Sequence, residues 1–149
     1  MYQRILIATD GSDLSRMAVD SGIELAALAG AQVVALKVIP RYPVSYFEGS
    51  KSLSANNQDI AATEKQWADA ALAVVEEVKA SAEAKGVKAK AITKTSDLIA
   101  ESIIAMAKKH NCDLIVMASH GRRGLKRVLM GSETTHVLTH SHIPVLVLR

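Results

Sequence analysis

The hydrophobic positions of this 149-residue chain fall into short apolar runs that alternate with longer segments of helical spacing. The runs are rich in Val, Ile and Leu, which is typical of strands buried on both faces. This pattern predicts five strands, at residues 5–9, 32–39, 87–93, 113–118 and 144–148. Four helices are expected between them: one ending at Gly30, one ending at Gly86, one around Ile99–Met106, and one at Ser132–Ser141.

The spacing also predicts which helix positions face the core. For the first helix, these are Leu14, Met17, Ala18, Ser21, Leu25 and Leu28. For the long helix that follows a loop at residues 41–59, they are Trp67, Ala71, Val74, Val78 and Ala82. Ser96 or Asp97 is expected to cap the third helix. The loop at 41–59 has the composition of a lid.

Strands that alternate with helices predict an α/β fold, an open doubly wound parallel sheet with helices on both faces. In the strand order 3-2-1-4-5, the first and fourth strands are neighbours at the point where the winding reverses. Ligands of such sheets bind beyond the carboxyl ends of the strands at that point. The loops after these two strands, at Asp10–Asp13 and Ala118–Ser132, are therefore expected to form one site.

Composition narrows the functional classes. Hydrophobic residues make up 49%, charged residues 22% and aromatic residues 3%, with a net charge of +3. So few aromatic residues and so mild a charge make nucleic acid an unlikely partner. The single cysteine, Cys112, excludes an internal disulfide and favours a reducing compartment. No apolar run approaches a membrane span, and a strand-like pattern begins almost at once, so we expect one cytoplasmic domain.

The loop after the fourth strand has the chemistry of an anion site. Gly121 and Gly131 let the backbone approach a phosphate closely, and Ser132 is expected to cap the helix that follows. The basic residues of this loop are Arg122, Arg123, Lys126 and Arg127. A simpler interpretation treats the glycines and Ser132 as turn and cap residues. The basic cluster within a glycine loop favours phosphate.

Other polar residues allow two interpretations each. Asp10 can accept hydrogen bonds from ribose hydroxyls or hold a metal ion, but an Asx-turn is as good an explanation. His120 can donate to phosphate, although a structural hydrogen bond within the loop is more common. The cluster of His136, His140 and His142 lacks the metalloprotease arrangement, and Cys112 is expected to be inert.

Motifs of catalysis are missing from the sequence. It has no Gly-x4-Gly-Lys-[Ser/Thr] phosphate loop, no Gly-x-Gly-x-x-Gly fingerprint after the first strand, and no Gly-x-Ser-x-Gly elbow. No nucleophile stands beside an evident base. These gaps disfavour an enzyme.

The chain resembles the universal stress protein family from end to end. The resemblance includes the opening segment Ile5–Ser12 and the closing segment Ile143–Val147. The nucleotide-binding branch of that family carries Gly-x2-Gly-x9-Gly-[Ser/Thr] after its fourth strand. This chain has Ala118, Gly121, Gly131 and Ser132 at the four defined positions. The spacing is intact, and Ala118 replaces the first glycine, which predicts weakened binding.

The resemblance implies ATP, with Mg²⁺ or Mn²⁺ possible, and a homodimer through the last strand. By position, the nucleotide-binding residues would be Ala8, Thr9, Asp10, Val38, Met117, Ala118, His120, Gly121, Arg122, Arg123, Gly131, Ser132, Glu133 and Thr134. The dimer would form through Val145, Leu146, Val147 and Leu148, an apolar strand that is expected to leave an unprotected sheet edge.

Three functions follow as hypotheses. The first is an ATP-binding regulatory or stress-response protein in which nucleotide alters the lid or the dimer. The second is a slow ATP-hydrolysing enzyme, which the basic loop would serve. The third is an interaction module that has lost nucleotide binding, supported by Ala118.

Overall fold

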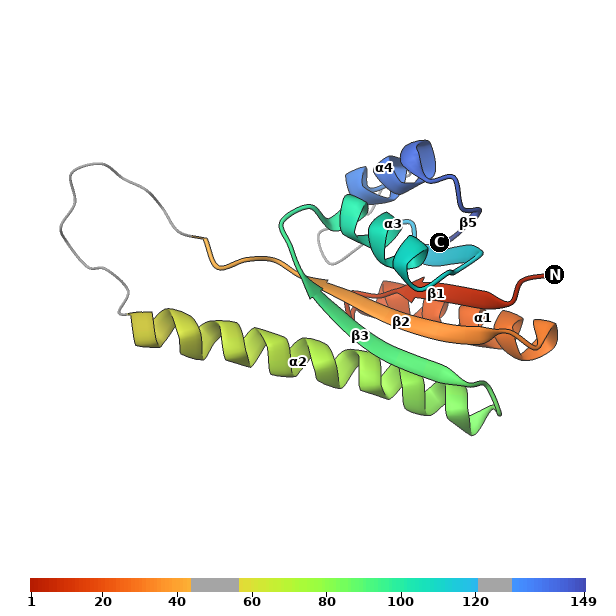
Figure 1. Ribbon diagram of the computed structural model, residues 1–149, viewed down its shortest axis with the longest axis horizontal. Helices are drawn as coiled ribbons and strands as arrows, with labels where there is room; N and C mark the ends of the chain where they lie inside the picture. Colours follow the sequence, from red (N-terminus) through yellow and green to blue (C-terminus); the bar gives the residue numbers. More distant parts are fainter. Residues whose placement is uncertain (44–56, 121–129) are drawn as a thin grey trace.

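Five parallel strands form one sheet in the order β3-β2-β1-β4-β5. The computed structural model describes residues 1–43, 57–120 and 130–149. The strands are β1 (Arg4–Ala8), β2 (Gln32–Ile39), β3 (Ala89–Thr95), β4 (Leu114–Ala118) and β5 (Val145–Leu148). The sequence-derived strand order is therefore confirmed, and β3 and β5 are the two edges of the sheet (Figure 1).

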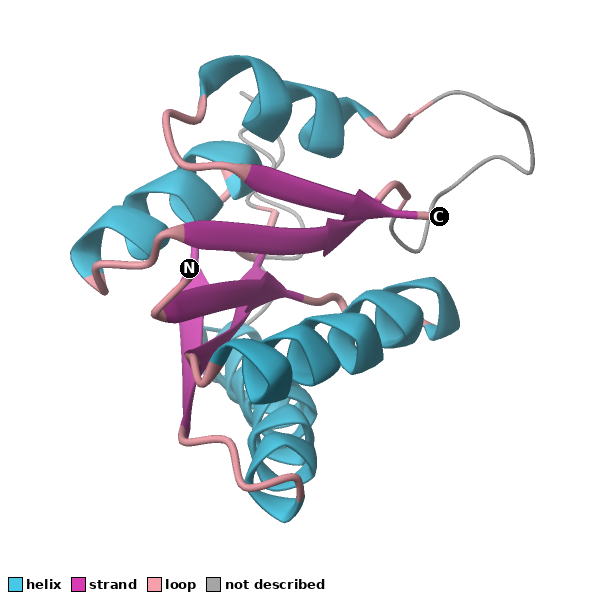
Figure 2. Cartoon of the chain, turned by 90° about the vertical axis from the view of Figure 1, so that its right-hand side faces the viewer, coloured by secondary structure: helices cyan, strands magenta, loops and turns pink. Residues whose placement is uncertain are grey.

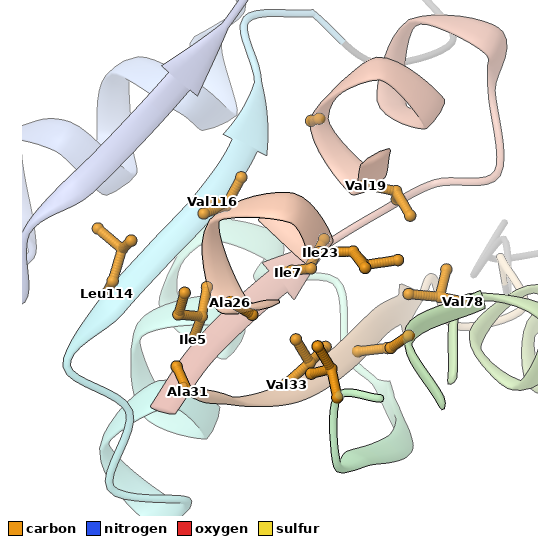
Figure 3. Close-up of a cluster of buried hydrophobic side chains, with 14 of the residues drawn as sticks. Ile5, Ile7, Val19, Ile23, Ala26, Ala31, Val33, Val78, Leu114 and Val116 are labelled. Carbon is orange, nitrogen blue, oxygen red and sulfur yellow. The ribbon is translucent and has the colours of Figure 1, made fainter. Parts of the chain in front are cut away.

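Helices cover both faces of this sheet (Figure 2). The helices are α1 (Asp13–Ala29), α2 (Asn57–Ala84), α3 (Ile99–Lys109) and α4 (Ser132–His140). Side chains of α1 and α2 pack with Ile5, Ile7 and Val33 in one apolar cluster (Figure 3). Side chains of α3 and α4 pack with Leu6 and Leu36 in a second cluster on the other face. The fold is thus the doubly wound α/β fold that the alternation of elements predicts.

The buried face of α1 differs from the expected one. Leu14, Met17 and Leu28 are exposed, with 47%, 56% and 88% of their surface accessible. The residues that face the sheet are smaller: Ser15, Ala18, Val19, Gly22, Ile23 and Ala26. A Cβ placed on Gly22 would lie 2.8 Å from Cδ1 of Ile7, so this glycine lets α1 approach the sheet closely. Ala18 is buried as predicted and Leu25 packs against the core, but the prediction was wrong for Leu14, Met17 and Leu28, because the largest apolar residues were taken as the core face.

The long helix α2 buries most of the expected stripe. Ala71, Val78 and Ala82 lie in the core, together with Val75, whereas Val74 is only partly buried. Trp67 lies nearer solvent, where its ring stacks on Tyr42 at a centroid distance of 5.8 Å.

Helix ends follow the glycine signals more closely than the polar cap signals. Gly30 and Gly86 both adopt positive φ, 67° and 75°, and end α1 and α2 as expected. The cap of α3 is different: Leu98 occupies the N-cap position and makes no side-chain cap bond. Ser96 and Asp97 instead accept hydrogen bonds from the backbone N–H groups of Leu98 and Arg41, so the prediction of either as the cap was wrong.

None of the helices within residues 1–43, 57–120 and 130–149 combines the length and apolar character that crossing a bilayer requires.

Candidate functional site

The sheet topology places the ends of β1 and β4 side by side. Ile7 pairs with Val116 in parallel register, and the two strands then lead to helices on opposite faces of the sheet. Thr9 and Asp10 follow β1, while Ser119 and His120 follow β4. The structure therefore brings together the two loops that the sequence analysis singled out, at the point where the winding reverses.

The loop after β1 is held by its own hydroxyl groups. Thr9 is buried, its N–H donates to the carbonyl of Leu36 at 3.0 Å, and its Oγ1 lies 2.9 Å from Oγ of Ser15. The N–H of Gly11 donates to the same Thr9 Oγ1 at 3.1 Å. The Thr9 side chain thus fixes the course of the loop into α1.

Asp10 adopts the Asx-turn that was one of its two interpretations. Its Oδ1 accepts a hydrogen bond from the N–H of Ser12 at 2.9 Å, and its backbone carbonyl accepts one from Lys37 Nζ at 3.2 Å. Ser12 in turn caps α1, because its Oγ accepts from the N–H of Ser15. The bond from the Ser12 backbone therefore helps to position the carboxylate at the loop entrance.

The loop after β4 is closed at its base by the Gly131 N–H and the Thr134 hydroxyl. The N–H of Gly131 donates to the carbonyl of Ser119 at 2.8 Å. Thr134 Oγ1 lies 3.0 Å from the carbonyl oxygen of Ala118 and 3.3 Å from that of Ser119. Thr134 is buried, so this contact is shielded from water. The chain thus returns to the end of β4 before α4 begins.

Gly131 has a steric role at this base. A Cβ placed on it would lie 3.2 Å from the Ser119 carbonyl oxygen, which is a backbone atom held by two donors. Gly131 is also the N-cap of α4, whereas Ser132 is the first helical residue. The expectation that Ser132 caps this helix was therefore wrong.

The first turn of α4 points N–H groups at this edge of the sheet. The first backbone bond of the helix runs from the N–H of Thr135 to the carbonyl of Gly131. The N–H groups of Ser132, Glu133 and Thr134 come before it, and a helix leaves such groups without intrahelical acceptors. Together with the positive end of the helix dipole, they favour an anion.

Glu133, predicted as a nucleotide-binding residue, bonds to the backbone of α3. Its Oε2 accepts a hydrogen bond from the N–H of Ala100 at 3.0 Å, in the first turn of α3. Glu133 therefore links two helices. A direct contact between this carboxylate and a phosphate would bring two negative charges together, whereas its bond to α3 avoids such a contact.

The remaining predicted residues lie on the strands beneath the loops. Ala8, Val38 and Met117 belong to the face that packs against α3 and α4, and Ala118 belongs to the opposite face. His120 is half-buried, and its Nδ1 lies 3.1 Å from Oγ of Ser119.

Gly121, Arg122 and Arg123 lie outside the described residues, as do Lys126 and Arg127. Most of the loop predicted at 41–59 also lies there.

The histidines on α4 make local contacts. His136 Nε2 lies 3.3 Å from Glu101 Oε1, and the rings of His136 and His140 are 4.2 Å apart. Within the described ranges, no three His, Cys, Asp or Glu side chains are grouped so that they could hold a metal ion. Burial raises the pKa of the Cys112 thiol to about 11, which keeps it protonated at neutral pH.

Sequence comparison now places the chain among known proteins. Residues 1–149 match the Universal stress protein family. The chain belongs to this family. Among curated members it is 36% identical to Universal stress protein MJ0531 of Methanocaldococcus jannaschii, in an alignment that covers all of this chain and 83% of that protein.

Solved structures of other members share the fold. The structure of MJ0577 from the same archaeon matches with a TM-score of 0.81 at 28% identity, over 99% of this chain and 96% of that one. A universal stress protein in complex with cAMP matches with a TM-score of 0.69 at 24% identity, over 99% and 97%. An Arabidopsis thaliana family member with AMP bound matches with a TM-score of 0.66 at 18% identity, over 98% and 90%.

Proposed function

We propose that this chain is a regulatory protein that binds an adenine nucleotide, ATP in the first place, at the carboxyl edge between β1 and β4. The observation that carries the proposal is the closed base of the loop after β4. There Gly131 bonds to Ser119 and directs the first turn of α4 toward that edge. The nucleotides in the structures of two family members support the same class of ligand.

Each part of the site would have a separate task. The N–H groups of Ser132 and Thr134 would donate to phosphate oxygens. The Asp10 carboxylate, held at the loop entrance, would accept from ribose hydroxyls. Val38 stands in register beyond Leu36, which pairs with Ala8, and offers an apolar wall to the base. Gly121, Arg122 and Arg123 stay predicted phosphate ligands from the sequence.

A Mg²⁺ or Mn²⁺ ion would bind together with the nucleotide, through its phosphate groups. Magnesium commonly keeps several waters and is held by one or two carboxylates plus substrate phosphates. Asp10, in the loop after β1, would be the carboxylate to face such an ion, because the Glu133 carboxylate bonds to α3.

Calorimetry tests this proposal directly. ATP with Mg²⁺ should bind the wild-type chain, and Gly131→Ala should bind at least about tenfold more weakly because the added methyl group displaces the loop base. Gly131→Glu should bind more weakly still, since its carboxylate would face the phosphates. Thr139→Glu is the matched control, because it adds the same charge in the exposed last turn of α4.

The outcomes separate the hypotheses. If the folded wild-type chain gives no heat with ATP, the proposal fails and the interaction module stands. If ATP binds and is converted to ADP within hours, the hydrolysing enzyme stands. Equal weakening by Gly131→Glu and Thr139→Glu would show that the charge, and not the loop base, is responsible.

We also propose that two copies pair through β5. This strand is a sheet edge, and its four residues are only partly buried. The carbonyls of Pro144 and Leu148 accept bonds from β4, so strand alternation turns the backbone groups of Val145 and Val147 outward. An apolar edge with such groups is suited to pairing with a second copy. The cytoplasm stays the predicted compartment.

A further inference from the structure

A second hollow lies at the opposite edge of the sheet from the proposed nucleotide site. It has a volume of about 290 Å³ and lies between the amino ends of β1, β2 and β3 and the end of α3. Five basic side chains line it, and no carboxylate is among the lining residues in the described part of the chain. The basic residues are Arg4, Lys88, Lys90, Lys109 and His110.

The hollow exists because α3 ends before the sheet does. Arg4 pairs with Gln32, and Val34 pairs with Lys90, so these positions lie in two neighbouring rows on one face of the sheet. The α3 helix stops at Lys109, and α2 packs on the other face of β2 and β3 (Figure 1). The amino ends of β2 and β3 are therefore left uncovered on the α3 face, and polar residues occupy them.

The Arg4 side chain is held in place by hydrogen bonds to neutral groups. Its Nη1 donates to the carbonyl of His110 at 2.8 Å, and its Nε and Nη2 lie 3.3 and 3.1 Å from Oε1 of Gln32. The adjacent carboxylate of Asp113 accepts instead from the backbone N–H groups of Gln3 and Arg4. The guanidinium is thus held in place without an ion pair to a carboxylate in the described part of the chain.

Among the residues that the structure describes, the lysines of the hollow likewise have no carboxylate partner. The ion pairs among the described residues are Lys65–Asp69, Lys85–Glu24 and His136–Glu101. Lys88, Lys90 and Lys109 are exposed and take part in none of them. Positive charges that gather around a concave surface without anionic side chains attract small anions.

The pKa of His110 is lowered in part by the same positive charges. Burial lowers the pKa of its imidazole first, and the charges of Lys90, Lys109 and Arg4, from β3, α3 and β1, lower the pKa further. A bound anion would oppose those three charges and would raise this pKa.

We propose that this hollow is a binding site for a small polyanion with two or more phosphate groups. Its volume is at the lower end of small-molecule sites, which fits a compact ligand and not a nucleic-acid backbone. Arg4 presents a guanidinium fixed by three bonds, and the lysines supply further charge around it. The strand from Arg4 to Asp10 separates this site from the nucleotide site by about 20 Å.

Proton NMR of the histidine rings tests the proposal with inorganic tripolyphosphate as the probe. The His110 signals, assigned with His110→Gln, should show a pKa that rises when tripolyphosphate binds. Lys90→Gln should weaken binding about tenfold, the loss of one charge-assisted contact. Lys94→Gln is the matched control, because Lys94 is an exposed residue of the same strand and face but does not line the hollow.

Three results would overturn the site. The first is an unchanged His110 pKa at saturating tripolyphosphate, or an equal rise with NaCl at the same ionic strength. The second is an equal loss of affinity for tripolyphosphate in Lys90→Gln and in Lys94→Gln. The third is displacement of tripolyphosphate from His110 by double-stranded RNA at lower concentration, which would assign the surface to nucleic acid. A response retained in Gly131→Glu would show that this site is independent of the proposed nucleotide site.

Discussion

The Glu133 carboxylate accepts a hydrogen bond from the Ala100 backbone N–H at 3.0 Å. Glu133 lies in the first turn of α4 and Ala100 in the first turn of α3, so this hydrogen bond joins the starts of the two helices. The N-cap of α3, Leu98, has no side-chain oxygen to offer. Glu133 thus performs the capping of α3 from a neighbouring helix, and it ties α3 to the helix that begins at the candidate site.

Glu133→Ala is expected to lower the free energy of unfolding by about 1 kcal/mol, the usual effect of losing a helix cap. Glu133→Gln should lose less, because its amide oxygen can still accept from Ala100. Urea unfolding followed by circular dichroism measures both. Glu77→Ala is the control, since Glu77 is exposed on α2. Equal losses for Glu77→Ala and Glu133→Ala would contradict a capping role.

The same variant distinguishes the cap from the ligand role that the sequence suggested. If Glu133 binds nucleotide directly, Glu133→Ala should weaken ATP binding. If it serves α3, removal of its charge from the start of α4 should leave ATP affinity unchanged or increase it, because the helix end becomes more positive. Calorimetry at matched ionic strength measures whether Glu133→Ala lowers or raises the affinity for ATP.

Gly22→Ala is expected to destabilise the fold although alanine favours helices. The added methyl group would lie 2.8 Å from Ile7 Cδ1 and 3.4 Å from Val116 Cγ1. Overpacking of this kind costs about 1–3 kcal/mol, against about 1 kcal/mol gained in helix propensity. Thermal or urea unfolding would measure the net loss.

A double-mutant cycle with Ile7→Val identifies the cause of that loss. Ile7→Val alone should cost about 1 kcal/mol, because it removes a buried methyl group. In the Gly22→Ala background the same change should cost less or stabilise, since it makes room for the new methyl group. Strict additivity of the two changes would refute the contact.

The sequence predicted the architecture well because strand burial dominates it. Continuous apolar runs identify strands that are covered on both faces, and the alternation with helices leaves few topologies. The buried face of α1 was predicted at Ala18 but otherwise mostly missed, for a physical reason. Its contact with the sheet depends on the small residues Ala18, Gly22 and Ala26, while Leu14 and Leu28 remain in solvent.

The candidate site was predicted only in part. Asp10, Gly131 and Thr134 gather at one edge because strand order fixes where loops meet. The roles of individual residues depend on tertiary contacts that no local pattern carries. Glu133 bonds to α3 thirty-three positions away, and Gly131 takes the cap position that Ser132 was expected to hold. The basic hollow was missed because its residues come from three strands and one helix end.

Cys112 is expected to react slowly with thiol reagents in the folded protein. It is buried, and its pKa of about 11 leaves little thiolate at pH 8. Reaction with a disulfide reagent should be at least about tenfold faster in guanidinium, where the pKa returns to its ordinary value. Because it is the single cysteine of the chain, the absorbance change reports this residue alone.

The same thiol links stability to alkaline pH. A pKa raised in the folded state gives stability that is fully present below pH 9, the ordinary value, and is lost as the pH rises through about 11. Cys112→Ala should lose less stability than the wild type between pH 9 and 11. Parallel losses for the two proteins across this range would reject the assignment.

Val147→Pro is expected to give monomers if β5 is the dimer edge. Proline removes the outward N–H that a second strand would need, and edge strands tolerate it. Val147→Thr retains that N–H and should remain dimeric. Sedimentation velocity measures both, and a dimer that survives Val147→Pro would exclude pairing through this edge.

The backbone of Ser119 connects the two proposed events. Its N–H donates to the carbonyl of Leu148 at the end of β5, and its carbonyl accepts from Gly131 at the start of α4. One residue therefore bonds both to the strand proposed to pair with a second copy and to the base of the loop proposed to hold a nucleotide. Any coupling between the two events is reciprocal by thermodynamic linkage: if nucleotide strengthens the dimer by some factor, dimerisation strengthens nucleotide binding by that same factor. The apparent ATP affinity would then depend on protein concentration.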